Sequence, residues 1–279
     1  KRAKKLWQTF EYFSGYGFNK SHAVSYSMIS YQCAWLYYHY PAEWMASFLD
    51  REPETRKEKA INIAKSHGFE IEPLNVNTSG MNWEVSGNKL IAPLTTIKGL
   101  GEKAIEQILA NRPFRKIEDF LFNENIVYSK LNKKALDVLI RAGAMADLID
   151  DRFAGDKHFW SAVCVDRPRK LKNLNENIDL YRPEGSFTEE ETISFITELT
   201  GMFPFSLVIT YDVEDRIKEL CVPPISEFDP NLLLCWAIPR EVILKKTKRG
   251  KPYYQVEVID SNSKMTRLRC WGIDPDRDY

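Results

Sequence analysis

Residues 15–49 read GYGFNKSHAVSYSMISYQCAWLYYHYPAEWMASFL, and this stretch decides how the rest of the chain is interpreted. Its apolar side chains recur at steps of four, three and four, at Val24, Met28, Tyr31 and Trp35. That spacing predicts one face of a helix. Pro41 is expected to end this helix and to begin a second, shorter one through Leu49.

The first turn of the expected helix carries Lys20, Ser21 and His22, after a possible cap at Asn19. A helix start with cationic side chains and open backbone N–H groups favours anions. An ordinary buried helix whose first turn lies in water has the same pattern. The chemistry of these residues by itself favours that second interpretation.

The sequence of residues 15–49 closely resembles a hallmark segment of the replicative DNA polymerases of family C, the bacterial DNA polymerase III alpha subunits. The agreement extends through many consecutive positions. In that family the segment lies in the fingers, near the incoming nucleotide and the template. The resemblance therefore implies that Lys20, Ser21 and His22 face phosphates of nucleotide or nucleic acid, without deciding which phosphate each one meets.

The composition is that of a soluble globular protein of two or three domains, with 279 residues, 44% hydrophobic and 28% charged. Lys plus Arg and Asp plus Glu both number 39, so a nucleic-acid binder must gather its cations locally. Five cysteines without CxxC spacing predict neither a zinc site nor disulfides, and they suit a reducing cytoplasm. No apolar run reaches membrane-spanning length. Because the chain begins at Lys1, we expect a fragment or a processed product.

Residues 97–105, IKGLGEKAI, form the second informative motif. Gly99 and Gly101 allow a tight turn and a close approach to a phosphate, and the N–H groups of the following helix point at that anion. Lys98 and Lys103 add charge that holds a DNA backbone without reading sequence. A plain helical turn capped by glycine is the alternative. The resemblance places a helix-hairpin-helix element here and favours DNA binding.

A second helical pair is expected between residues 119 and 143, with an apolar stripe and a C-terminal cap at Gly143. The family carries a degenerate partner of the first hairpin at this place. This copy lacks the two-glycine turn, so we expect it mainly to pack. Lys133 and Lys134 are candidates for a contact with the DNA backbone.

Residues 151–187 are polar, basic and rich in asparagine, which predicts a linker. Family members commonly carry a glutamine-led sliding-clamp motif in this region. The linker contains no glutamine, but Asn177, Leu180 and Tyr181 keep the rest of the pattern. An extended peptide could lay Leu180 and Tyr181 into an apolar pocket of a clamp. The alternative is that both side chains pack the linker onto a neighbouring domain.

An acidic helix capped by Thr188 begins the last region, followed by strands expected at residues 232–244, 253–260 and 264–271. The turn TKRG at residues 247–250 resembles the OB domain of the same family. Strand parity points Tyr254, Val256, Val258, Leu268 and Cys270 into a core, and points Gln255 and Trp271 outward. The proposed single-stranded DNA contacts are Lys248, Arg249, Tyr253, Arg267 and Arg269. A solvated face of a short barrel is the alternative, and three strands make the OB barrel incomplete.

The expected architecture is therefore an α+β multidomain chain. Residues 1–66 end a helical fingers domain, residues 67–150 form a tandem helix-hairpin-helix region, residues 151–187 a linker, and residues 188–279 a truncated OB-type barrel. The expected function is that of the C-terminal part of a DNA-directed DNA polymerase, a nucleotidyltransferase. Its expected partners are duplex and single-stranded DNA, a deoxynucleoside triphosphate, a sliding clamp and the remainder of the polymerase that bears the palm.

In such polymerases the palm precedes the fingers and holds the catalytic Mg²⁺ ions. We therefore expect this chain to contain no catalytic residue or metal ligand and to be inactive alone. A non-enzymatic DNA-binding accessory protein built from the same hairpin and OB modules is the competing interpretation. The fingers segment argues against it, because a plain binding module has no use for one.

Overall fold

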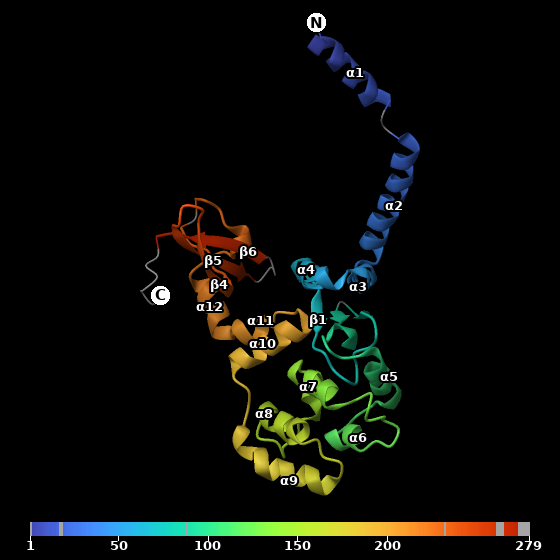
Figure 1. Ribbon diagram of the computed structural model, residues 1–279, viewed down its shortest axis with the longest axis vertical. Coiled ribbons are helices and arrows are strands. Elements are labelled where there is room, and N and C mark those ends of the chain that lie inside the picture. Colours follow the sequence, from blue (N-terminus) through green and yellow to red (C-terminus); the bar gives the residue numbers. More distant parts are fainter. Residues whose placement is uncertain (1, 17–18, 88, 232, 261–264, 273–279) are drawn as a thin grey trace.

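The computed structural model describes residues 2–16, 19–87, 89–231, 233–260 and 265–272. Helices α1 (Arg2–Tyr16) and α2 (Lys20–His39) form an arm that projects from the rest of the molecule (Figure 1). Gly15 lies within α1, and Gly17 lies outside the described residues. None of the described helices is long and apolar enough to cross a membrane.

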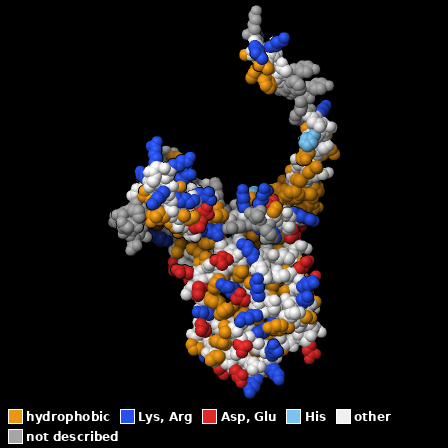
Figure 2. Space-filling view, viewed as in Figure 1, with side chains coloured by type: hydrophobic (Ala, Val, Ile, Leu, Met, Phe, Trp, Pro, Cys, Tyr) orange, Lys and Arg blue, Asp and Glu red, His pale blue; other side chains and the backbone are white. Residues whose placement is uncertain are grey.

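The helix expected in the opening stretch forms, but it is not a buried one. No described side chain of α2 is buried, and the four residues of its apolar face are 44 to 70% exposed: Val24, Met28, Tyr31 and Trp35. Hydrophobic side chains are therefore visible on the surface of the arm (Figure 2). Pro41 occupies the first turn of α3 (Pro41–Arg51), as expected, and α3 buries Met45 and Leu49. The body of the molecule therefore begins at α3 and continues through α4 (Glu54–Ser66).

A small sheet follows, with strands β1 (Glu70–Glu72), β2 (Glu84–Ser86) and β3 (Lys89–Ile91) in the order β1-β3-β2. Strand β1 is parallel to β3, and β2 is antiparallel to it. The chain then continues through η1 (Leu94–Thr96), α5 (Glu102–Asn111), α6 (Ile117–Leu121), α7 (Lys133–Arg141) and η2 (Ala146–Leu148). Helix α7 buries its apolar stripe, so the packing role expected for this second pair is found.

Residues 151–187 do not form the predicted linker. They fold into α8 (Asp156–Trp160), η3 (Ser161–Val165), α9 (Leu171–Tyr181) and η4 (Arg182–Glu184). Phe159 is fully buried and joins the same apolar core as α5 and α7. His158 is also fully buried, where its Nδ1 accepts from Ala154 N–H at 2.8 Å and its Nε2–H therefore donates to the Ile178 carbonyl at 2.7 Å. The polar composition of this segment did not predict its burial, because the buried polar groups form their hydrogen bonds with backbone atoms.

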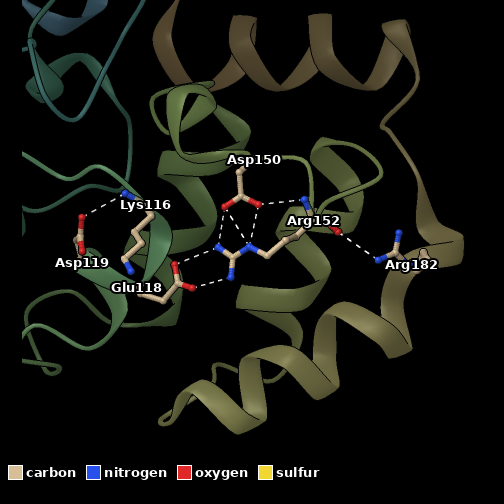
Figure 3. Close-up of polar contacts among 6 residues, drawn as sticks. All are labelled: Lys116, Glu118, Asp119, Asp150, Arg152 and Arg182. Carbon is tan, nitrogen blue, oxygen red and sulfur yellow. Dashed lines mark hydrogen bonds and ion pairs between the residues drawn. The ribbon is translucent and has the colours of Figure 1, made fainter.

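An ion-pair network fastens the folded segment to the hairpin region. The Arg152 guanidinium bonds Glu118 of α6 (Nη1 to Oε1, 2.6 Å) and Asp150 (Nη2 to Oδ2, 2.6 Å). Arg182 of η4 donates to the Arg152 carbonyl at 3.4 Å (Figure 3). The hydrogen bonds from Arg152 hold the pKa of both the Glu118 and the Asp150 carboxyl below their usual values. Arg152 thus pairs with carboxylates from two separate segments, and Arg182 adds a hydrogen bond from a third.

Helix α10 (Glu189–Thr200) begins as expected, with Thr188 and Glu191 in a capping box, and ends at Gly201 in the left-handed conformation. It packs against the helical body rather than against the sheet that follows. Phe195 lies 3.7 Å below the Arg141 guanidinium of α7, and the Leu199 carbonyl accepts from Lys98 N–H at 2.8 Å. The contacts of α10 therefore lie with the hairpin region.

After α11 (Phe205–Val208), α12 (Tyr211–Glu219) and η5 (Ile225–Glu227), the chain forms an antiparallel sheet in the order β4-β5-β6. Its strands are β4 (Ile238–Lys246), β5 (Pro252–Ile259) and β6 (Met265–Cys270). Strand β4 starts later than the sequence predicted. The register Val256↔Leu268 and Gln255↔Arg269 puts residues on the two faces that parity predicts.

Burial on this sheet departs from the prediction in two places. Gln255, expected outside, is only 8% exposed and accepts a hydrogen bond from Lys245 Nζ at 3.0 Å. Val242 and Leu244, on the face expected to form the barrel core, are 58% and 46% exposed. The three described strands form an open sheet, and an open sheet leaves part of its apolar face uncovered.

Candidate nucleic-acid interface

The turn before α5 combines buried apolar side chains, which pack into the core, with two exposed glycines. Ile97 and Leu100 are 1% and 9% exposed, so they fix the turn to the core. Gly99 has φ +89°, a conformation that other residues adopt only with strain. Gly101, the N-cap of α5, has φ −78°, and a Cβ added there would meet no atom within 4 Å. Gly99 is thus needed for the turn itself, whereas Gly101 leaves the surface in front of the helix open.

The start of α5 presents backbone donors. Across the described residues, the N–H groups of Gly101, Glu102 and Lys103 have no hydrogen-bond acceptor. Lys98 and Lys103 are exposed on either side of them. Backbone N–H groups at a helix start, flanked by lysines, suit a phosphate.

Lys133 and Lys134 are adjacent in the sequence, but from the start of α7 their side chains reach different parts of the molecule. The N-cap of α7, Asn132, accepts from Ala135 N–H. A Cβ on Gly99 would lie 3.6 Å from Lys134 Cε, so Lys134 reaches the first hairpin turn. Lys133 points elsewhere, because its Nζ donates to the Val165 carbonyl at 3.0 Å. The structure therefore assembles Lys98, Lys103 and Lys134 around the glycine turn.

Lys20, Ser21 and His22 lie at the exposed start of α2, on the arm and apart from the hairpin (Figure 1). Asn19 caps the helix: its Oδ1 accepts from His22 N–H at 3.1 Å and from Ser21 Oγ at 2.7 Å. The His22 ring lies 4.3 Å from that of Tyr26. The side chains of Lys20 and His22 remain open to an anion, whereas the Ser21 hydroxyl proton is already donated.

The sheet brings some of its candidate residues together. Tyr253 and Trp271 stack with ring centroids 4.7 Å apart, and Arg269 is exposed on the same face. Arg267 differs, because its Nε donates to Glu257 Oε1 at 2.9 Å. Lys248 and Arg249 lie in the exposed turn between β4 and β5. An aromatic pair beside an arginine can stack on a nucleic-acid base.

The residues of the expected sliding-clamp motif do not form an extended peptide. Asn177, Leu180 and Tyr181 lie in α9. Asn177 is 8% exposed, and its Nδ2 donates to the carbonyls of Ala162 at 2.8 Å and Asp166 at 2.7 Å. The expectation that this amide binds a partner is therefore wrong. Leu180 is 67% exposed and remains available.

The sequence interpretation missed a basic cluster at Arg167, Arg169 and Lys170. These residues belong to the run RPRKLK, which composition assigned to the linker. Its density of Lys and Arg was the signal, but only the fold shows what they lie beside. The described residues contain no group of three or more His, Cys, Asp or Glu side chains that could hold a metal ion.

Comparisons with known proteins agree with this geometry. The helix-hairpin-helix motif family matches residues 68–154, which include both hairpins. The DNA polymerase III subunit alpha of Thermus aquaticus is 38% identical over 273 residues, which cover 89% of this chain and 22% of that protein. The subunits of Aquifex aeolicus (38% over 268 residues, 93% of this chain) and Vibrio cholerae (36% over 246 residues, 78% of this chain) are similar too. This chain spans about a fifth of the length of these relatives. The resemblance seen in the sequence is therefore confirmed: over most of its length the chain is a relative of the DNA polymerase III alpha subunits.

Proposed function

We propose that this chain binds the backbone of duplex DNA through the hairpin turn at residues 98–103. One observation carries the proposal: the open N–H groups at the start of α5 lie beside Lys98, Lys103 and Lys134. Such contacts hold phosphates and carry no sequence information. A chain with no net charge can bind DNA in this way because its cations are gathered at the turn.

We further propose that the chain acts as part of a DNA-directed DNA polymerase, with nucleotidyl transfer carried out by a palm outside this chain that holds Mg²⁺. The relatives are named as polymerase subunits. The match to the Aquifex aeolicus subunit covers 93% of this chain, so only a small part of the chain is unmatched. An accessory protein of hairpin and OB modules explains the arm less well, since such a protein needs no fingers segment. By itself the chain would be inactive.

In this proposal, the OB-type sheet contacts the single-stranded template. Tyr253, Trp271 and Arg269 support it, because stacking on aromatic rings holds single strands without sequence preference. Lys248 and Arg249 add charge at the neighbouring turn. Arg267 contributes less, since Glu257 already neutralises it.

The hairpin is tested with Gly101→Val. No atom lies within 4 Å of a Cβ at this position, so the variant should fold, but its side chain covers the phosphate-binding surface. Duplex affinity should fall roughly tenfold, for the loss of about one hydrogen bond to a charged group. The slope of log affinity against log salt should flatten by about one unit. Fluorescence anisotropy with two unrelated duplexes measures both.

Single-stranded DNA supplies the internal control for that experiment. Gly101→Val should leave single-strand binding unchanged, because the sheet lies elsewhere in the molecule. Unchanged duplex affinity and salt slope in the folded variant would contradict the hairpin contact. A wild-type chain that does not bind single strands would contradict the role of the sheet.

A sliding clamp is the further partner that we propose, through the exposed end of α9. In the complete polymerase, replacing Leu180 and Tyr181 together with alanine should abolish clamp binding and processive synthesis but spare distributive synthesis. Asn177 takes no part, because its amide is bound to two backbone carbonyls. Leu171→Ala, an exposed leucine at the other end of α9, is the matched control. Clamp affinity that survives the double replacement would show that the contact lies elsewhere.

A further inference from the structure

A cluster of cations lies beside the second hairpin, formed by Arg167, Arg169 and Lys170 between η3 and α9. Arg167 fixes its place. Its Nη1 donates to the Leu131 carbonyl, just before α7, and its guanidinium carbon lies 4.5 Å from the centre of the Tyr128 ring. The folding of residues 151–187 therefore brings a distant basic run back to the loop between α6 and α7.

This cluster is joined to the first hairpin through α7. Lys134 lies against the Gly99 turn, and the preceding Lys133 donates to the Val165 carbonyl, two residues before Arg167. Lys130, in the loop that leads to α7, is exposed next to the same place. The start of α7 thus lies between the two basic sites, because Lys134 reaches the glycine turn and Lys133 reaches the segment just before Arg167.

Among the described residues, no carboxylate forms an ion pair with a cation of this cluster. In the part of the chain that the structure describes, no ion pair joins Lys130, Arg169 or Lys170 to a carboxylate, whereas Lys172 pairs with Glu176 at 3.7 Å. Arg167 is half-buried, and burial lowers its pKa. Its bonded partner is a neutral carbonyl. A partly desolvated cation without a counter-ion gains more from an arriving anion than a paired one does.

We propose that Arg167, Arg169 and Lys170 bind the phosphate backbone of the same DNA duplex that the first hairpin turn holds. This inference rests on the proposed function. The arginines offer planar, paired donors that match a phosphate, and Lys170 adds a mobile point charge. Contacts of this kind hold the phosphate backbone and carry no sequence information. The duplex is thereby bound at two places, the first hairpin turn and this cluster.

The test uses the full chain with a 24-base-pair duplex and the double variant Arg169→Gln with Lys170→Gln. Two lost phosphate contacts should lower the salt slope by about 1.8 units. The advantage of wild type over the variant should therefore shrink about tenfold between 50 and 200 mM salt. Lys172→Gln is the matched control, because this exposed lysine in the adjoining first turn of α9 already has an acidic partner, and the variant should bind with the wild-type slope.

The outcomes separate this inference from the proposed function. The double variant could keep the wild-type salt slope while the Gly101→Val protein loses affinity. That result would overturn the DNA contact of the cluster and leave the hairpin contact supported. Wild-type binding that does not depend on salt overturns both. A loss confined to an RNA duplex of the same length would overturn the assignment to DNA.

Discussion

Phe159→Ala is expected to lower the free energy of unfolding of the helical body by about 3–5 kcal/mol, the usual cost of deleting a buried aromatic side chain. Phe159 is fully buried, and its ring meets that of Phe153 edge-on at 4.9 Å. The truncation removes this contact and leaves a cavity in a core shared with the hairpin helices. A residue in a linker would cost almost nothing to truncate, so the measurement decides how residues 151–187 are organised.

Urea unfolding followed by circular dichroism measures this change, and hydrogen exchange at the amides of α9 gives a local reading. Leu180→Ala is the matched control, because a leucine that is 67% exposed should change stability by less than about 0.5 kcal/mol. Equal stability of the Phe159→Ala and Leu180→Ala proteins would contradict the folded arrangement. Weaker protection in both α9 and the hairpin helices of the Phe159→Ala protein would support one common core.

In the complete polymerase, Lys20→Ala and His22→Ala should each raise the nucleotide concentration needed for half-maximal incorporation by roughly 10- to 100-fold. That range corresponds to the loss of one hydrogen bond to a charged phosphate, worth about 1.5–3 kcal/mol. Both side chains are exposed at a capped helix start that carries no carboxylate in its first turn. The expected loss therefore comes from anion binding and not from folding.

Single-nucleotide incorporation against nucleotide concentration measures this effect. Ser25→Ala is the control on the same helix, because its hydroxyl bonds the Ser21 carbonyl within α2 at 2.9 Å and faces no proposed ligand. Wild-type kinetics for Lys20→Ala and His22→Ala would assign the cluster to an ordinary solvated helix start. Equal losses in all three variants would point to a general defect of the arm.

Local signals in the sequence predicted local structure well. Thr188 and Glu191 form the capping box that begins α10, and Gly201 ends that helix in the left-handed conformation. The glycine pair at residues 99 and 101 predicted the hairpin turn that the motif family also matches. Alternation in β5 and β6 predicted which side chains share a face. Each of these features depends on residues within a few positions of one another, so a pattern in the chain is sufficient to reveal it.

The sequence by itself therefore determined the helices, the glycine turn and the relationship to the polymerase subunits. Only the tertiary structure decided that residues 151–187 are folded, that Asn177 is buried, and that Lys134 reaches the Gly99 turn while Lys133 does not. It also decided that Arg167 lies beside Leu131, which is 36 residues earlier in the chain. The physical reason is that burial and charge pairing depend on contacts between distant segments. A polar run is buried when backbone carbonyls from elsewhere in the fold satisfy its donors, and composition does not record those partners.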